Sequence, residues 1–256
     1  MVDTVFVILH TMSDFPPNIL CKTSSAADGN MSFRIGETDN SLQNREQFLM
    51  NNGIDFKNHV CMKCDHGEQI TTVNRSTENQ KDGTFGSKTQ EDMLLSEVLV
   101  TQEKGLALML LTADCMPVSL YDPITQTIAL AHFSRETISK NLPQKTISLL
   151  RERFAVDPAN LLINVGPYIH TDSYSFPANN HNIQSNILPF TKEIDDKNFV
   201  DLIAACNQQL TQAGVELANI AVSTINTHVS PNHFSHYASR TQNTLKGRLA
   251  TVLMMK

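Results

Sequence analysis

The chain has 256 residues, of which 41% are hydrophobic and 18% are charged, and its formal net charge is -6. This length and composition are typical of a globular protein that buries a substantial core. The mild acidity argues against nonspecific binding to nucleic acid, which needs a basic stripe, although net charge says little about a single local site. Five cysteines, an odd number, do not indicate a disulfide framework, so the cytoplasm is the expected location.

The N-terminal run VFVIL comes first among the predicted elements. It is too short to cross a bilayer and lacks the basic flank of a secretory signal, so it is expected to be a core strand. No other apolar run approaches the length of a membrane span, and no membrane association is expected.

The first predicted helix is SLQNREQFLMNNG. Leu42, Phe48 and Leu49 would share its buried face. Ser41 is a suitable cap for its start, and Gly53 can end it.

Two more helices are expected further along the chain. One begins near Pro143, because proline is accepted in a first turn, and turns Ile147, Leu150 and Phe154 inward. The other follows Asp195–Asp196, has FVDLIAACNQQL as its body and ends before Gly214.

The remaining apolar runs predict strands, and several of them follow one another directly. These runs are QITTV, ALMLL, PVSLY, TIALAHF, NLLINV, NIAVS and RLATVLM. Strands interleaved with helices in this way predict an α+β fold, with a mixed β-sheet core flanked by helices, rather than a doubly wound parallel sheet. The polar clusters between the runs are typical of surface loops and mark no domain boundary, so residues 1–256 are expected to form a single domain.

The stretch TADCMPVSLYDP places an acid and a thiol, Asp114 and Cys115, between two apolar runs. The following DPITQ is a turn signal, and it predicts an antiparallel hairpin centred near Ile124. Equal steps outward from that centre set Cys115 opposite His132 or Phe133, where cross-strand side chains lie roughly 5 Å apart.

A cysteine and a histidine in this arrangement have three interpretations: a nucleophile with its base, two metal ligands, or two core residues. A metal would need a third ligand, and His66 in CDHGEQITTV is the best candidate because it precedes a predicted strand. Cys61 and Cys64 form a C-x-x-C pair. No second pair follows at zinc-finger spacing, so an incidental pair of thiols is favoured over a separate zinc site.

These motifs together resemble a known family. TADCMPVSLYDP, TIALAHF and DHGEQITTV are similar in order and spacing to segments of the YfiH/DUF152 family. Its members are called multicopper polyphenol oxidases, laccase-domain proteins or purine nucleoside phosphorylases. The resemblance covers most of the chain, because further matches are SSAADGNMSFRIG, QNREQFL, EVLVTQEKGLALMLLTADC, HFSHYASR and KGRLATVL. It implies the layered architecture of the YfiH and CNF1-like proteins.

The resemblance also implies a metal site formed by His66, Cys115 and His132. Three such ligands with an open fourth position are the pattern of a catalytic zinc. Copper is a weaker candidate, because a multicopper oxidase groups its histidines in His-x-His pairs and this sequence has none.

The activity implied by the resemblance is phosphorolysis of purine nucleosides, with deamination of adenosine as a second reaction. The substrates would be phosphate with adenosine, inosine or methylthioadenosine. Arg45 matches the Asn-Arg pair of the family and is the candidate for binding phosphate. Asp114 would orient a ligand or accept a proton, or simply cap a turn. Cys115, Asp114 and Arg45 are therefore the candidate catalytic residues.

The sequence departs from the family pattern around the expected pocket. HFSRET stands where members continue as His-Ala-Gly-Trp-Arg-Gly, and Arg135 replaces the family arginine only if a gap is allowed. His170 stands in GPYIHTDSYSF where members have a second glycine. Arg135 and His170 are thus candidate substrate-binding residues, and altered specificity is one consequence of these changes.

Two other functions remain open. One is a cysteine hydrolase or amidase, in which Cys115 is the nucleophile and His132 its base. The other is a member that binds a metal or nucleotide without catalysis. Bound metal would argue against the hydrolase, because a thiolate tied to zinc is a poor nucleophile.

Overall fold

The structure of the protein is a computed structural model that describes residues 15–76, 84–178 and 184–256. The predicted strand VFVIL lies outside the described residues. Among those that are described, no helix is both long and apolar enough to cross a membrane.

One sheet has five strands in the order β1-β14-β6-β2-β4. β1 and β6 both run antiparallel to β14, whereas β2 runs parallel to β6 and β4. The strands are β1 (Ile19–Thr23), β2 (His59–Lys63), β4 (Leu94–Leu95), β6 (Ala107–Thr112) and β14 (Leu249–Met255).

A second sheet has six strands in the order β13-β9-β7-β8-β5-β3. β8 runs antiparallel to β5 and β7, and the outer pairs β3–β5 and β9–β13 are parallel. The strands are β3 (Ile70–Thr72), β5 (Val98–Thr101), β7 (Met116–Asp122), β8 (Thr127–Phe133), β9 (Leu162–Val165) and β13 (Ile220–Val222). A small third sheet contains β10 (Ser175–Pro177), β11 (Thr191–Ile194) and β12 (Lys197–Val200).

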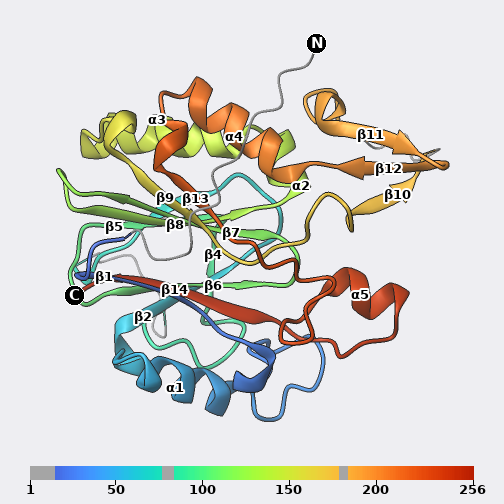
Figure 1. The fold of residues 1–256 in the computed structure, drawn as a ribbon. Helices are drawn as coiled ribbons and strands as arrows, with labels where there is room; N and C mark the ends of the chain where they lie inside the picture. The colour runs from blue at the N-terminus through green and yellow to red at the C-terminus, as the bar shows by residue number, and fades with distance from the viewer. Residues whose placement is uncertain (1–14, 77–83, 179–183) are drawn as a thin grey trace.

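The two large sheets pack face to face between two helical layers (Figure 1). Leu108 and Leu253 of the first sheet meet Leu99 and Leu130 of the second in the central core. α1 (Ser41–Asn51) covers the outer face of the first sheet, and α3 (Leu142–Phe154) and α4 (Leu202–Gln212) cover that of the second. The short helices are α2 (Arg135–Ser139) and α5 (His236–Thr241).

The structure confirms the α+β fold with mixed sheets, and most of the predicted elements. α1 and α3 form as expected, although Asn40 rather than Ser41 is the N-cap of α1. The expected start of the third helix is wrong. Asp195 and Asp196 have φ of 48° and 58° and form the turn between β11 and β12. The helix begins only after Asp201, whose side chain caps it by accepting a hydrogen bond from the backbone N–H of Ala204.

Three connections cross from the first sheet to the second at one edge of the sandwich. They join β2 to β3, β4 to β5, and β6 to β7. They leave the same edge because β2, β4 and β6 run parallel, and they arrive at the same edge because β3, β5 and β7 also share one direction. β8 runs in the opposite direction, so its last residues end there too.

Candidate metal centre and active site

The three crossings and the end of β8 bring a set of polar side chains together. The first crossing carries Cys64 and His66, the second carries Glu97, and the third carries Cys115. His132 is the penultimate residue of β8. The break in the apolar run at TADC is therefore the point at which the chain passes from one sheet to the other.

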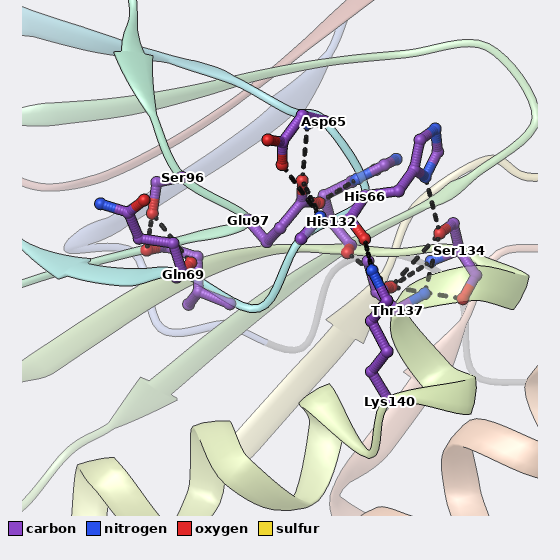
Figure 2. A network of polar contacts seen from close by, with 11 residues as sticks. Asp65, His66, Gln69, Ser96, Glu97, His132, Ser134, Thr137 and Lys140 are labelled. Carbon is purple, nitrogen blue, oxygen red and sulfur yellow. Dashed lines mark hydrogen bonds and ion pairs between the residues drawn. The ribbon is translucent and has the colours of Figure 1, made fainter.

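His132 and Glu97 form a buried pair at the centre of this set. The imidazole Nδ1 lies 2.6 Å from the Oε2 of Glu97, and the two side chains are 5% and 1% exposed. The other oxygen of Glu97 accepts backbone N–H groups from Asp65 at 2.8 Å and Gly67 at 3.2 Å (Figure 2). Nδ1 is thus occupied, and Nε2 is the nitrogen of His132 left for a metal.

Two thiols approach His132. Cys64 and Cys115 both lie within hydrogen-bonding reach of the imidazole. The donor atoms of Cys64, Glu97 and His132 lie within 4.8 Å of one another, close enough to hold one metal ion. Burial alone would lower the pKa of His132, but charge interactions and hydrogen bonds with Cys64 and Cys115 in their thiolate form raise that pKa well above its usual value.

His66 is held in an unusual backbone conformation beside this pair. Its φ is 63°, its carbonyl accepts a hydrogen bond from Lys140, and its Nδ1 lies 3.0 Å from the hydroxyl oxygen of Ser134 (Figure 2). Its ring centroid is 5.2 Å from that of His132. Among the described residues, the three donor atoms that all lie within 4.8 Å of one another are those of Cys64, Glu97 and His132, so His66 and Cys115 would have to move closer to bind one ion together with His132.

Asp114 connects the third crossing to the C-terminal segment. Its carboxylate accepts hydrogen bonds from the hydroxyl of Thr227 and the backbone N–H of Tyr237, both at 2.7 Å. Its φ is 86°, and its carbonyl accepts the N–H of Ile169. These contacts give Asp114 a structural role at the edge of the site, in keeping with the capping interpretation, and a catalytic role for it stays a prediction.

The structure confirms the predicted hairpin but shifts its register. Met116 pairs with Phe133 and Pro117 with His132, so Cys115 lies one residue beyond the paired strands rather than opposite His132 or Phe133. The shift arises because the turn has four residues, from Pro123 to Gln126, and its centre falls after Ile124. The thiol nevertheless reaches the imidazole.

These side chains open into a cavity of about 1090 Å³. His66, Cys115 and His132 line it together with Cys64. The rest of its wall includes cationic and aromatic side chains from distant parts of the chain. The cationic ones are Arg34, Lys63, Arg135, Arg240 and Arg248, and the aromatic ones are Tyr174, Phe176 and Tyr237.

Arg135 is fixed at the aromatic wall of the cavity. It is hydrogen-bonded to the hydroxyl of Tyr174, and its guanidinium carbon lies 5.4 Å from the ring centroid of Phe176. Arg248 also lines the cavity and is within electrostatic reach of the Cys115 thiol and of Asp114. The cavity thus holds two partly buried guanidinium groups, and that of Arg248 lies near Cys115.

The structure does not bring Arg45 or His170 into the cavity wall. Arg45 is fully buried: its Nε donates to the carbonyl of Met31 at 2.7 Å, and its guanidinium lies 3.7 Å from the ring centroid of Phe33. It sits behind Met93, which does line the cavity. His170 packs its ring on Tyr168 at 4.6 Å. A phosphate role for Arg45 therefore has no support from this geometry.

Two residues of the cluster, Cys64 and Glu97, were not among the predicted site residues. Cys64 was interpreted together with Cys61 as a C-x-x-C pair. Residues three apart on an extended chain point to opposite faces, so the two thiols do not lie at the same place. Cys61 accordingly packs near Arg45 in the core below the first sheet, and only Cys64 joins the site. The signal for Glu97 was an acid directly before the apolar run VLVT.

The layered fold brings cysteine, histidine and glutamate side chains that could hold a metal ion to one edge of the two packed sheets. The chain belongs to the family described as multi-copper polyphenol oxidoreductase laccase, whose model matches residues 21–256. Among solved structures, YlmD from Geobacillus stearothermophilus is similar with a TM-score of 0.82 and 21% identity, over 94% of this chain and 93% of that one. The Bacillus licheniformis protein YfiH is similar with a TM-score of 0.75 and 21% identity, over 89% and 85% of the two chains.

Relatives with curated names point to one activity. A Streptomyces coelicolor protein named purine nucleoside phosphorylase is 28% identical over 85% of this chain and 86% of its own length. The purine nucleoside phosphorylase YlmD of Bacillus subtilis is 22% identical over 84% and 77% of the two chains.

Proposed function

We propose that this protein is a zinc-dependent purine nucleoside phosphorylase that acts on adenosine, inosine or methylthioadenosine. One observation carries the proposal: the cluster around His132 opens into the same cavity as Arg135 and Arg248. The names of the relatives support the same activity. The cavity, at about 1090 Å³, is large enough for a nucleoside and a phosphate together.

Phosphate would bind between Arg135 and Arg248. Guanidinium groups suit phosphate because they donate two parallel hydrogen bonds to its oxygens. Arg135 is already oriented by Tyr174 and Phe176, so little freedom would be lost on binding. These two arginines replace Arg45 as the candidates for phosphate.

The purine would stack on the aromatic wall. Tyr174 lies edge-on to both Phe176 and Tyr237, with centroid distances of 5.6 and 6.4 Å, and all three side chains face the cavity. Stacking of a base on one aromatic side chain contributes about 1–3 kcal/mol. This contact does not depend on the substituent of the purine, which agrees with acceptance of several nucleosides.

In phosphorolysis, a phosphate oxygen forms a bond to C1′ of the ribose while the bond from C1′ to N9 of the purine breaks. The purine leaves with the electron pair of that bond and takes up a proton, and ribose 1-phosphate is the other product. The arginines would hold the phosphate in line with the breaking bond and offset its charge.

The donor set fits zinc, because thiolate and imidazole are the ligands that zinc prefers. His66, Cys115 and His132 would hold the ion, and Glu97 would fix the orientation of His132. A zinc ion there would act as a Lewis acid and lower the pKa of water in its coordination sphere, which is the chemistry that deamination of adenosine requires. Since all five cysteines are free thiols, we also propose a reducing, cytoplasmic location.

The test is release of hypoxanthine from inosine by the zinc-loaded protein, with and without phosphate. We expect release that depends on phosphate, and we expect Arg135→Ala to raise the KM for phosphate at least roughly tenfold with a smaller change in the KM for inosine. The matched control is Arg75→Ala, because Arg75 pairs with Glu103 on the surface and does not line the cavity. Absence of phosphate-dependent release from adenosine, inosine and methylthioadenosine would refute the proposal and favour a binding-only member.

A second function, a cysteine hydrolase, is favoured by one specific contact. Cys115, His132 and Glu97 form a thiol, an imidazole and a carboxylate in series, with Nδ1 of His132 bonded to the carboxylate at 2.6 Å. This is the order of groups that activates a cysteine nucleophile. Rapid alkylation of Cys115 in protein that contains no zinc as purified would favour this function.

A further inference from the structure

Cys64 has no place in the three-ligand site of His66, Cys115 and His132, yet the structure puts its thiol inside the cluster. The Cys64 donor atom lies within 4.8 Å of those of Glu97 and His132. The thiol also reaches the imidazole of His132, as Cys115 does. Cys64 lines the cavity only in part and is mostly covered by neighbouring side chains.

Glu97, the third member of that group, is not free to bind an ion. Its Oε1 accepts two backbone N–H groups, and its Oε2 is 2.6 Å from Nδ1 of His132. A metal on either oxygen would compete with these hydrogen bonds, which are buried and costly to leave unmade. Of the two additional donors, the thiol of Cys64 is therefore the one available to a metal.

We propose that Cys64 is a fourth metal ligand, which completes a site of two thiolates and two imidazoles with Cys115, His66 and His132. The inference rests on the metal site of the proposed function and adds to it a donor that the family pattern does not include. Two cysteines and two histidines form the closed tetrahedral set of zinc. Cys64 would thus fill the position that an open catalytic zinc leaves to water or substrate.

A closed site would control the access of substrate to the metal. With Cys64 bound, no coordination position remains for a ligand, and the thiolate has to leave before a substrate atom can take its place. The position of Cys64 allows this, because it follows the last residue of β2 and lies in a connecting segment rather than in a paired strand. Two thiolates also favour soft ions, so zinc, cadmium and copper(I) would be preferred over magnesium or manganese.

The experiment uses the full chain with cobalt(II) in place of zinc, since cobalt reports thiolate ligands through charge-transfer absorption. We expect Cys64→Ser and Cys115→Ser each to remove part of this absorption and to weaken zinc binding at least roughly tenfold in competition with a chelator. Cys61→Ser is the matched control. It changes the other cysteine of the same C-x-x-C pair, which packs in a different core, so the spectrum should not change.

A second measurement needs no variant. Zinc-loaded and zinc-stripped wild-type protein are treated with iodoacetamide, and each cysteine is followed by peptide mapping. We expect zinc to protect both Cys64 and Cys115 and to leave the alkylation of Cys21 unchanged. The proposal is overturned if Cys64 reacts equally fast with and without zinc, if Cys64→Ser keeps the full cobalt spectrum, or if the wild type binds neither ion.

These results are separable from those on activity. A two-thiolate cobalt spectrum without phosphorolysis would support Cys64 as a ligand and refute the proposed reaction. Phosphorolysis with a spectrum that does not depend on Cys64 would support the reaction and refute the fourth ligand.

Discussion

Replacement of Glu97 tests how the site is held together. Glu97→Ala removes the acceptor of three hydrogen bonds, from the backbone of Asp65 and Gly67 and from Nδ1 of His132. The pair with His132 is almost fully buried, and loss of one partner of such a pair costs about 3–5 kcal/mol in the free energy of unfolding. Glu97→Gln keeps an acceptor for the backbone and should cost less, roughly 1–3 kcal/mol.

Both Glu97 variants should also bind zinc more weakly. A partner that orients a metal-binding histidine typically accounts for about 10–100-fold in affinity, because the ring otherwise loses its preferred direction. Urea unfolding of the zinc-free proteins measures the first effect, and competition with a chelator measures the second. Glu103→Gln is the control, since its exposed pair with Arg75 should contribute less than about 1 kcal/mol. A Glu97→Ala protein as stable as the control would refute this account of the pair.

Two further predictions concern stability away from the metal. Burial lowers the pKa of His59 from 6.5 to about 4 in the folded protein. As the pH falls, this histidine therefore takes up its proton in the unfolded chain before it does so in the folded protein. The free energy of unfolding should fall by roughly 3 kcal/mol between pH 6.5 and pH 4. In urea titrations across this range, His59→Gln should flatten that part of the profile, and an unchanged slope would contradict the prediction. Asp114→Ala should lower the free energy of unfolding by roughly 3 kcal/mol, because the hydroxyl of Thr227 and the N–H of Tyr237 lose a charged acceptor. Asp114→Asn should lose less, and equal unfolding midpoints for wild type and Asp114→Ala would show that these contacts are not stabilising.

The sequence predicts local features of this fold well. The hairpin of β7 and β8 is encoded by two apolar runs around a turn signal, and its register differs from the predicted one because the centre of the turn falls after Ile124. The helix α3 follows from Pro143 and a periodic apolar face. Such features depend on neighbouring residues, so they can be read without knowledge of the rest of the fold.

The features that could not be predicted depend on contacts between distant segments. Nothing in the sequence indicates that β2, β4 and β6 lie in one sheet and the strands that follow them in another. It is this alternation that places Cys64 and Glu97 beside His132. Arg45 illustrates the same limit, because the carbonyl of Met31 and the ring of Phe33 cover a side chain whose helix position is typical of an exposed arginine.

Phosphorolysis in this cavity can be tested by detecting ribose 1-phosphate, by anion-exchange chromatography, after incubation of the zinc-loaded protein with inosine and phosphate. We expect ribose 1-phosphate and hypoxanthine in equal amounts from the wild type, and neither product from Cys115→Ser. Hypoxanthine with free ribose, or no product at all, would contradict the assignment of this cavity to phosphorolysis.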